Sequence, residues 1–223
     1  MDRAARSLLR SLPVVICALA SHASARDRAV MTWPTVNLQV SVDEGVPIPS
    51  ALVGDSEDIA SFIYSRMHVR LSWGSGQVTE NPLHRGTCDL ARATAVVIIK
   101  IALHAPPSVS NSALAMAAPY ASSGVRIVVF YERVEPLFRG HSATRASVLG
   151  YVLAHEIGHV LEGTTRHSDV GVMKALWSTN DFSLMGRGLL TFTDKDEQQI
   201  RVRLTDEACG VRMSKANEIR QTR

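Results

Sequence analysis

One segment in the second half of the chain, residues 151–174, constrains the fold more than any other part of the sequence. It contains the motif His155-Glu156-x-x-His159. Apart from Glu156, no charged residue or proline interrupts residues 152–161, so this stretch can form a buried helix. On such a helix His155 and His159 are four residues apart and lie on the same face. The sequence therefore predicts a helix that presents two imidazoles to one point.

Two imidazoles placed in this way can hold one zinc ion, which accepts neutral nitrogen ligands at about 2.0–2.1 Å. Gly163 is a suitable left-handed residue to end the helix, and His167 follows after a short reversal as a third nitrogen donor. Three donors would leave a fourth position for water, whose pKa zinc lowers to about 7. Glu156, next to His155, would take the proton of that water and pass it to the leaving amine. This is the HExxH arrangement of zinc hydrolases, so the expected cofactor is one catalytic Zn²⁺.

The third ligand is the least constrained part of this prediction. His167 lies eight residues after His159, beyond the end of the helix. Three acidic residues are alternative third ligands: Asp169, Glu162 and Glu197. A further alternative is a buried helix in which His155 and His159 bond only to carbonyl groups, without a metal.

The motif, the glycine turn, His167 and the nearby Met173 resemble the metzincin zinc peptidases, whose usual pattern is H-E-x-x-H-x-x-G-x-x-H. Here the glycine lies four residues after the second histidine instead of three, and the third histidine lies eight instead of six. The early methionine is similar to that of the minimal, archaemetzincin-like members. The resemblance implies a mixed sheet above the cleft, an edge strand that binds extended substrate, and a methionine-containing turn under the zinc. By position, Val125 to Tyr131 would be the edge strand and Met173 the turn residue, while Trp177 lines either the substrate pocket or the core.

Hydrophobic patterning predicts about four strands. Alternating or continuous β-branched residues mark Thr35–Val42, His68–Trp73, Thr94–Leu103 and Val125–Tyr131. Arg126, near the start of the last of these, suits an edge position. The stretch His104–Gly124, with its many alanines and serines, is expected to be a loop, and a loop of this length in a compact domain is often functional.

Three helices are expected around these strands. Their ranges are Ser50–Arg66, a motif helix capped by Ser142 or Thr144 and ending near Glu162, and Asp194 to about Thr205. Thr193 would cap the last helix, with Asp196 as its capping-box partner, and residues 164–188 are expected to be irregular. The predicted fold class is α+β and zincin-like, a mixed twisted sheet of about four strands with an active-site helix and a C-terminal helix.

Residues 1–25 have the features of a secretory signal peptide. A basic start with three arginines precedes a short apolar run and the sequence Ala23-Ser24-Ala25. The run is too short to span a bilayer easily, so no stable membrane span is expected after cleavage, although an uncleaved anchor is the alternative. The chain is therefore expected to be secreted or periplasmic. The expected organisation continues with a short leader at 26–34, a zincin-like catalytic domain at 35–210 and a polar tail at 211–223.

Charge and cysteine content narrow the functions further. The 223 residues carry a formal charge of only +3, and no cluster of Lys and Arg indicates a nucleic-acid surface. Cleavage would leave Cys88 and Cys209, which in an exported protein form either one disulfide or two free thiols. No oligomeric state follows from the sequence.

Three functions are compatible with these features. The first is an exported zinc-dependent endopeptidase, which acts on a protein or peptide substrate through Glu156, His155, His159 and His167. The second is a zinc-containing but catalytically weak domain that binds peptides or cell-wall material. The third is a metal-free secreted structural domain, which the placement of Glu156 and His167 favours least.

Overall fold

The computed structural model describes residues 33–75, 96–121, 124–139 and 143–204. The predicted signal peptide, Cys88, Cys209 and the C-terminal tail lie outside the described residues. In the described segments, no helix combines the length and the apolar character that crossing a bilayer requires.

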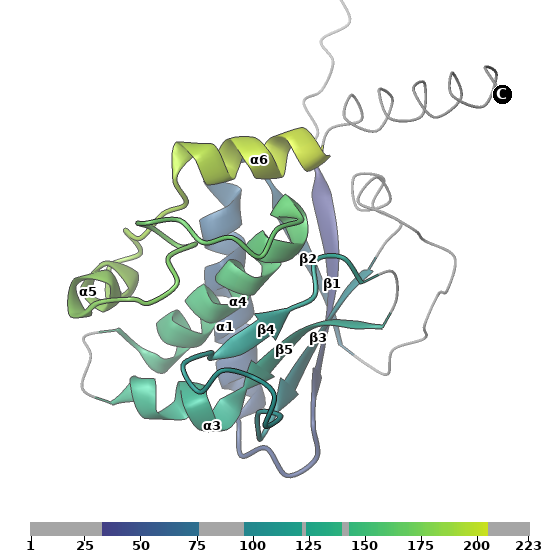
Figure 1. Ribbon diagram of the computed structural model, residues 1–223, viewed down its shortest axis with the longest axis vertical. Coiled ribbons are helices and arrows are strands. Elements are labelled where there is room, and N and C mark those ends of the chain that lie inside the picture. The colour runs from purple at the N-terminus through teal and green to yellow at the C-terminus, as the bar shows by residue number, and fades with distance from the viewer. Residues whose placement is uncertain (1–32, 76–95, 122–123, 140–142, 205–223) are drawn as a thin grey trace, which may run out of the picture. The chain divides into compact units, whose positions relative to one another are not determined.

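Five strands form a mixed sheet in the order β2-β1-β3-β5-β4 (Figure 1). Four of them run parallel to one another: β1 (Thr35–Val42), β2 (Arg70–Ser75), β3 (Val96–Ala102) and β5 (Val125–Phe130). These are the four strands that the sequence predicts, with ends shifted by a few residues. The fifth, β4 (Ala115–Ala117), runs antiparallel to β5.

The prediction of the edge strand is wrong. The sequence pattern assigns the edge to Val125 to Tyr131, but β5 has β3 on one side and β4 on the other, so β4 is the edge at this end of the sheet. β4 has only three residues, Ala-Met-Ala, inside the stretch that was expected to be a loop. Alanine is depleted in strands, so neither composition nor alternation marks these residues as a strand.

The helices predicted from the sequence are confirmed, and others are added. α1 (Ser50–Ser65), α4 (Arg145–Glu162) and α6 (Asp194–Leu204) lie where they are expected. Thr144 caps α4 by accepting a hydrogen bond from the N–H of Ser147. A short helix α3 (Tyr131–Val134) and a 3-10 turn η1 (Glu135–Phe138) follow β5.

The sequence pattern predicts that residues 164–188 are irregular. The structure corrects this in part, because the helix α5 (Thr179–Gly186) lies within them. Its start has a capping box in which Ser178 and Asp181 bond to each other's backbone N–H. This Ser-x-x-Asp pattern was readable in the sequence.

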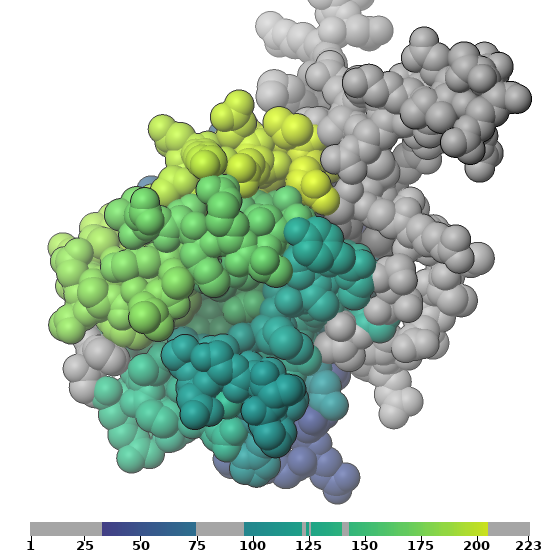
Figure 2. Space-filling view, viewed as in Figure 1, coloured from purple at the N-terminus to yellow at the C-terminus, as the bar shows by residue number. Residues whose placement is uncertain are grey.

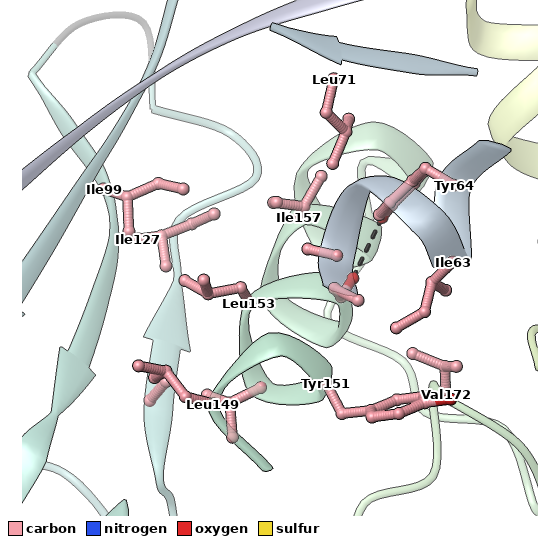
Figure 3. Close-up of a cluster of buried hydrophobic side chains, with 14 of the residues drawn as sticks. Ile63, Tyr64, Leu71, Ile99, Ile127, Leu149, Tyr151, Leu153, Ile157 and Val172 are labelled. Carbon is pink, nitrogen blue, oxygen red and sulfur yellow. Dashed lines mark hydrogen bonds between the residues drawn. The ribbon is translucent and has the colours of Figure 1, made fainter. Parts of the chain in front are cut away.

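The core lies where α4 packs between the sheet and α1. Leu149, Leu153 and Ile157 of α4 lie near Ile99 and Ile127 of the sheet, and all five are fully buried (Figure 3). Burying one such side chain contributes about 1.5–3 kcal/mol relative to leaving it exposed. The apolar face of α4 therefore anchors the helix that carries the histidine motif.

α1 fixes the position of α4 from the other side. A Cβ atom on Gly150 of α4 would lie 2.7 Å from Cγ2 of Ile59 and 2.9 Å from the carbonyl oxygen of Ser56, so only glycine permits this close crossing. Further along, the buried hydroxyl of Tyr64 donates a 3.0 Å hydrogen bond to the carbonyl of Ala154 (Figure 3). That contact is one residue before His155.

Candidate metal centre

Three histidines converge at the end of α4. His155 and His159 belong to the helix and His167 to the turn that follows, and each offers a nitrogen within 4.8 Å of the others. Within the described part of the chain, no other set of three or more His, Cys, Asp or Glu side chains comes together in this way. The structure thus brings His167, rather than an acidic side chain, to the helix pair.

The alternative third ligands lie elsewhere. Asp169 is exposed, Glu162 is buried and has Gln199 of α6 within hydrogen-bonding distance, and Glu197 pairs with Arg201 at 3.8 Å. None of these three acidic residues belongs to the histidine cluster.

Hydrogen bonds set the orientation of the two helix histidines. Nδ1 of His155 lies 2.8 Å from the carbonyl oxygen of Val172, and Nδ1 of His159 lies 2.9 Å from that of Thr164. A carbonyl oxygen can only accept, so Nδ1 carries the proton in both rings. In the neutral ring Nε2 then presents a lone pair, and the two Nε2 atoms are 3.1 Å apart.

This donor set fits a zinc ion. A tetrahedral zinc ion bound at about 2.0–2.1 Å separates two nitrogen ligands by about 3.3–3.4 Å, close to the observed separation of the two Nε2 atoms. Two lone pairs facing each other at short range repel unless a cation or a proton lies between them. The bond from each Nδ1 to a carbonyl is also the usual outer-shell contact of a histidine that binds a metal.

Burial keeps the imidazoles neutral. It lowers the pKa of His155 to about 3, which the bond to Val172 opposes in part, and the pKa of His159 to about 4. His167 is more exposed, and partial desolvation lowers the pKa of its ring as well. Neutral imidazole is the form that binds a metal, so these rings need not lose a proton at neutral pH before a metal binds.

The turn after α4 places the third histidine. Gly163 ends the helix in the left-handed conformation, with φ 61° and ψ 43°, as its place in the sequence predicts. The N–H groups of Gly163 and Thr164 both bond to the carbonyl of His159, and the Thr164 hydroxyl accepts from the N–H of Arg166. These bonds reverse the chain, so that His167 comes back over the end of the helix.

Residues 168–174 contact His155 and the helix that carries it. Val172, which accepts from His155, donates its own N–H to the carbonyl of Thr191 at 2.9 Å. Met173 is fully buried, and its sulfur lies where a Cβ on Gly158 would come within 2.5 Å. Gly158 thus leaves room for Met173 beside the helix turn that joins the two histidines. Met173 fills the core and also packs on the histidine-bearing helix.

Glu156 lines the same pocket as the histidines. Its side chain is 7% exposed, and burial raises its pKa to about 8. Among the residues that the structure describes, none donates a hydrogen bond to its carboxyl group. A divalent cation at the imidazoles would favour the carboxylate form. Glu156 is therefore available to exchange a proton with a molecule in the pocket.

The pocket beside the cluster has a volume of about 660 Å³. It is visible in Figure 2 as the hollow between residues 110–117 in teal and residues 165–182 in green. Its wall includes five apolar side chains from different elements: Leu114, Leu137, Val152, Trp177 and Phe182. Trp177 packs edge-on against the His155 ring at 5.6 Å; it lines the pocket wall and, being half-buried, also packs against the core, so both of its predicted locations apply. Leu137 and Phe182 come from η1 and α5, which the sequence pattern did not reveal.

Among the described residues, the strand β4 keeps backbone groups unpaired beside this pocket. The N–H of Phe130 bonds to the carbonyl of Leu114, and the N–H of Ala118 bonds to that of Arg126. Because bonded positions alternate along an antiparallel strand, the backbone groups of Ala115 and Ala117 face away from β5. Both alanines line the pocket. An extended peptide could therefore add to the sheet here by pairing with them.

Comparisons with known proteins add little to this picture. No protein-family model matches the chain, and no curated protein does. Among solved structures, the chain is similar to an archaemetzincin from Methanopyrus kandleri, with 16% identity and a TM-score of 0.46 over 77% of this chain and 96% of that chain. This likeness is too distant to assign a family.

Proposed function

We propose that this chain is a zinc-dependent endopeptidase in which His155, His159 and His167 hold the metal. The observation that carries the proposal is the pair of Nε2 atoms 3.1 Å apart on α4, in rings whose Nδ1 atoms bond to carbonyls, with His167 brought to the same cluster. The resemblance of residues 155–173 to the metzincin pattern supports the same reaction.

A zinc ion held there would act as a Lewis acid and lower the pKa of water. Glu156 takes the proton from the water that attacks the scissile carbonyl, and then delivers it to the leaving amine. Its position in a mostly apolar pocket suits both roles, because burial raises the pKa of its carboxyl group toward neutrality. Peptide hydrolysis in this form needs no covalent intermediate on the protein.

The proposed substrate is an extended peptide. Its backbone would pair with the outward groups of Ala115 and Ala117, while the apolar wall with Trp177 and Phe182 would take a side chain. An edge strand can bind a chain that continues on both sides of the cut, which favours an endopeptidase. We also propose that the protein is exported, on the basis of the signal-like residues 1–25.

Metal analysis and one substitution test this proposal together. The purified protein should contain about one zinc per molecule, and His155→Ala should lose it. Glu156→Gln should keep the zinc but reduce cleavage of a mixed peptide library by about 10²–10⁴-fold, the usual contribution of a general base. A folded wild-type protein without affinity for zinc would refute the proposal. Zinc binding without any cleavage by the wild type would favour the zinc-containing binding domain instead.

A further inference from the structure

The C-terminal helix α6 lies against the end of α4 (Figure 1). Three residues on one face of α6, at spacings of three and four, reach the turn that carries His167: Asp196, Gln199 and Arg203. The Gln199 amide lies 3.2 Å from both Glu162 Oε2 and Arg166 when its nitrogen faces Glu162. The Arg203 guanidinium covers Gly163, where a Cβ would come within 2.2 Å of its Nη2 atom.

Asp196 makes the most direct of these connections. Its side chain is 0% exposed, and Oδ1 accepts a 2.6 Å hydrogen bond from the hydroxyl of Ser168, the residue after His167. Its other oxygen, Oδ2, accepts from the Thr193 hydroxyl at 2.7 Å and from the Thr193 N–H at 3.1 Å. A single buried carboxylate thus caps its own helix and also holds the segment beside the third histidine.

Ser168 is the point through which this contact can act on His167. Its N–H donates to the carbonyl of Met173 at 2.8 Å, so its backbone and its side chain are both held. His167 lacks such support of its own. The Nδ1 atoms of His155 and His159 bond to carbonyls, but within the described part of the chain no hydrogen bond holds the His167 ring. Its ring contacts the rings of His155 and His159, and apart from these contacts its position depends on the backbone next to it.

We propose that Asp196 is a positioning residue that holds His167 at the metal through Ser168. This inference rests on the proposed zinc site, and it concerns only how the third ligand is placed. The physical reason is that an exposed ring on a turn would otherwise lose conformational freedom when it binds the metal. The bond from Ser168 to a buried carboxylate removes that freedom in advance, as outer-shell contacts do for metal ligands.

The hydroxyl groups of Ser168 and Thr193 both donate to the Asp196 carboxylate, so substituting each one gives a matched pair of variants. Ser168→Ala removes only the contact toward His167, whereas Thr193→Ala removes only the contact within α6. We expect Ser168→Ala to weaken zinc binding by about 10–100-fold, the usual effect of losing an outer-shell partner. Thr193→Ala should lower the unfolding temperature of the metal-free protein by about 2–4 °C, as expected for a lost helix cap, and leave zinc affinity within about twofold. Ser168→Thr retains the hydroxyl and should restore most of the affinity.

A double substitution separates positioning from a general loss of structure. If Ser168 acts through His167, then Ser168→Ala should change zinc affinity by less than about twofold when His167 is already alanine. The absorption spectrum of bound Co²⁺ gives a second measurement, because Ser168→Ala should change the ligand geometry and Thr193→Ala should not. Equal losses of zinc affinity in Ser168→Ala and Thr193→Ala, or an undiminished loss in the His167→Ala background, would overturn the inference.

Failure of this inference is distinguishable from failure of the proposed function. Zinc affinity is measured without substrate, so the positioning role is tested even if the protein cleaves no peptide. If the wild type and Ser168→Ala bind zinc equally tightly, the positioning role alone is refuted. Wild-type protein that binds no zinc refutes both.

Discussion

The two halves of the histidine cluster are built in different ways. His155 and His159 lie on α4, are 8% and 6% exposed, and each has an Nδ1 bond to a carbonyl. His167 lies on an exposed turn, and its place depends on Gly163, Ser168 and contacts from α6. In the helix, a regular backbone sets the distance between donors. In the turn, several separate contacts together bring the His167 imidazole to the same cluster.

This difference shows where the site is sensitive to distant changes. A helix packed between a sheet and a second helix tolerates the loss of one contact, because its backbone hydrogen bonds maintain the spacing of His155 and His159. The turn has no such redundancy. We therefore expect substitutions around the turn to alter metal binding more than substitutions of similar cost to stability around α4.

The largest expected effect comes from removing the donors themselves. His159→Ala and His167→Ala should each weaken zinc binding by more than about 100-fold, since losing even an outer-shell partner typically costs about 10–100-fold. His159→Ala should have the larger effect, because it breaks the pair that α4 holds 3.1 Å apart, whereas His167→Ala leaves that pair intact. Competition with a chromophoric chelator measures both affinities. A smaller loss in His159→Ala than in His167→Ala would contradict the comparison.

The same difference explains how much of the site the sequence predicts. A separation of four residues on a helix has one geometric meaning, so His155, Glu156 and His159 are predicted from the sequence alone. The eight residues from His159 to His167 have no single geometry, and acidic alternatives therefore stay open until the fold is known. The link from Asp196 to Ser168 spans 28 residues, and the sequence shows only the helix cap that Asp196 also forms.

The fold is predictable to a similar degree. β1, β3 and β5 have β-branched, buried residues, and the sequence predicts them within a few positions. β4 is a strand because it pairs with β5, and its three residues have no strand preference of their own. Because β4 forms only through this tertiary contact, the sequence pattern assigns the edge beside the pocket to the wrong strand.

A smaller effect is expected from Gly163→Ala in the turn. The left-handed conformation costs a residue with a Cβ about 1–2 kcal/mol, and the new methyl group would displace the Arg203 guanidinium. We expect this loss of stability together with a several-fold weaker zinc affinity, because the turn that carries His167 shifts. Urea unfolding and zinc titration measure the two quantities.

Gly54→Ala is the matched control for Gly163→Ala. Gly54 lies inside α1 at negative φ, and a Cβ there would have no heavy atom within 4 Å apart from its chain neighbours and the backbone of its own helix. The change should stabilise the protein by about 0.5–1 kcal/mol and leave zinc affinity unchanged. If Gly163→Ala also leaves zinc affinity unchanged, the turn does not control the position of His167.

Apart from the Gly54→Ala control, the smallest expected effect on zinc affinity comes from Tyr64→Phe, on the helix side of the comparison. This change removes the buried hydroxyl that donates to the carbonyl of Ala154, next to His155. It should lower the free energy of unfolding by about 0.5–1.5 kcal/mol, the usual net value of such a bond. Zinc affinity should stay within about twofold of the wild type, because the backbone of α4 still sets the spacing of the two imidazoles.

Tyr64→Phe and Ser168→Ala each delete one hydroxyl that supports the residue next to a histidine of the cluster. One hydroxyl supports the helix and the other supports the turn. If the helix is the rigid half, the first deletion acts on global unfolding and the second on zinc affinity. Comparable losses of zinc affinity in the two variants would mean that α4 depends on its neighbours as much as the turn does. A helix that kept its own geometry could not transmit the loss of the Tyr64 hydroxyl to His155 and His159.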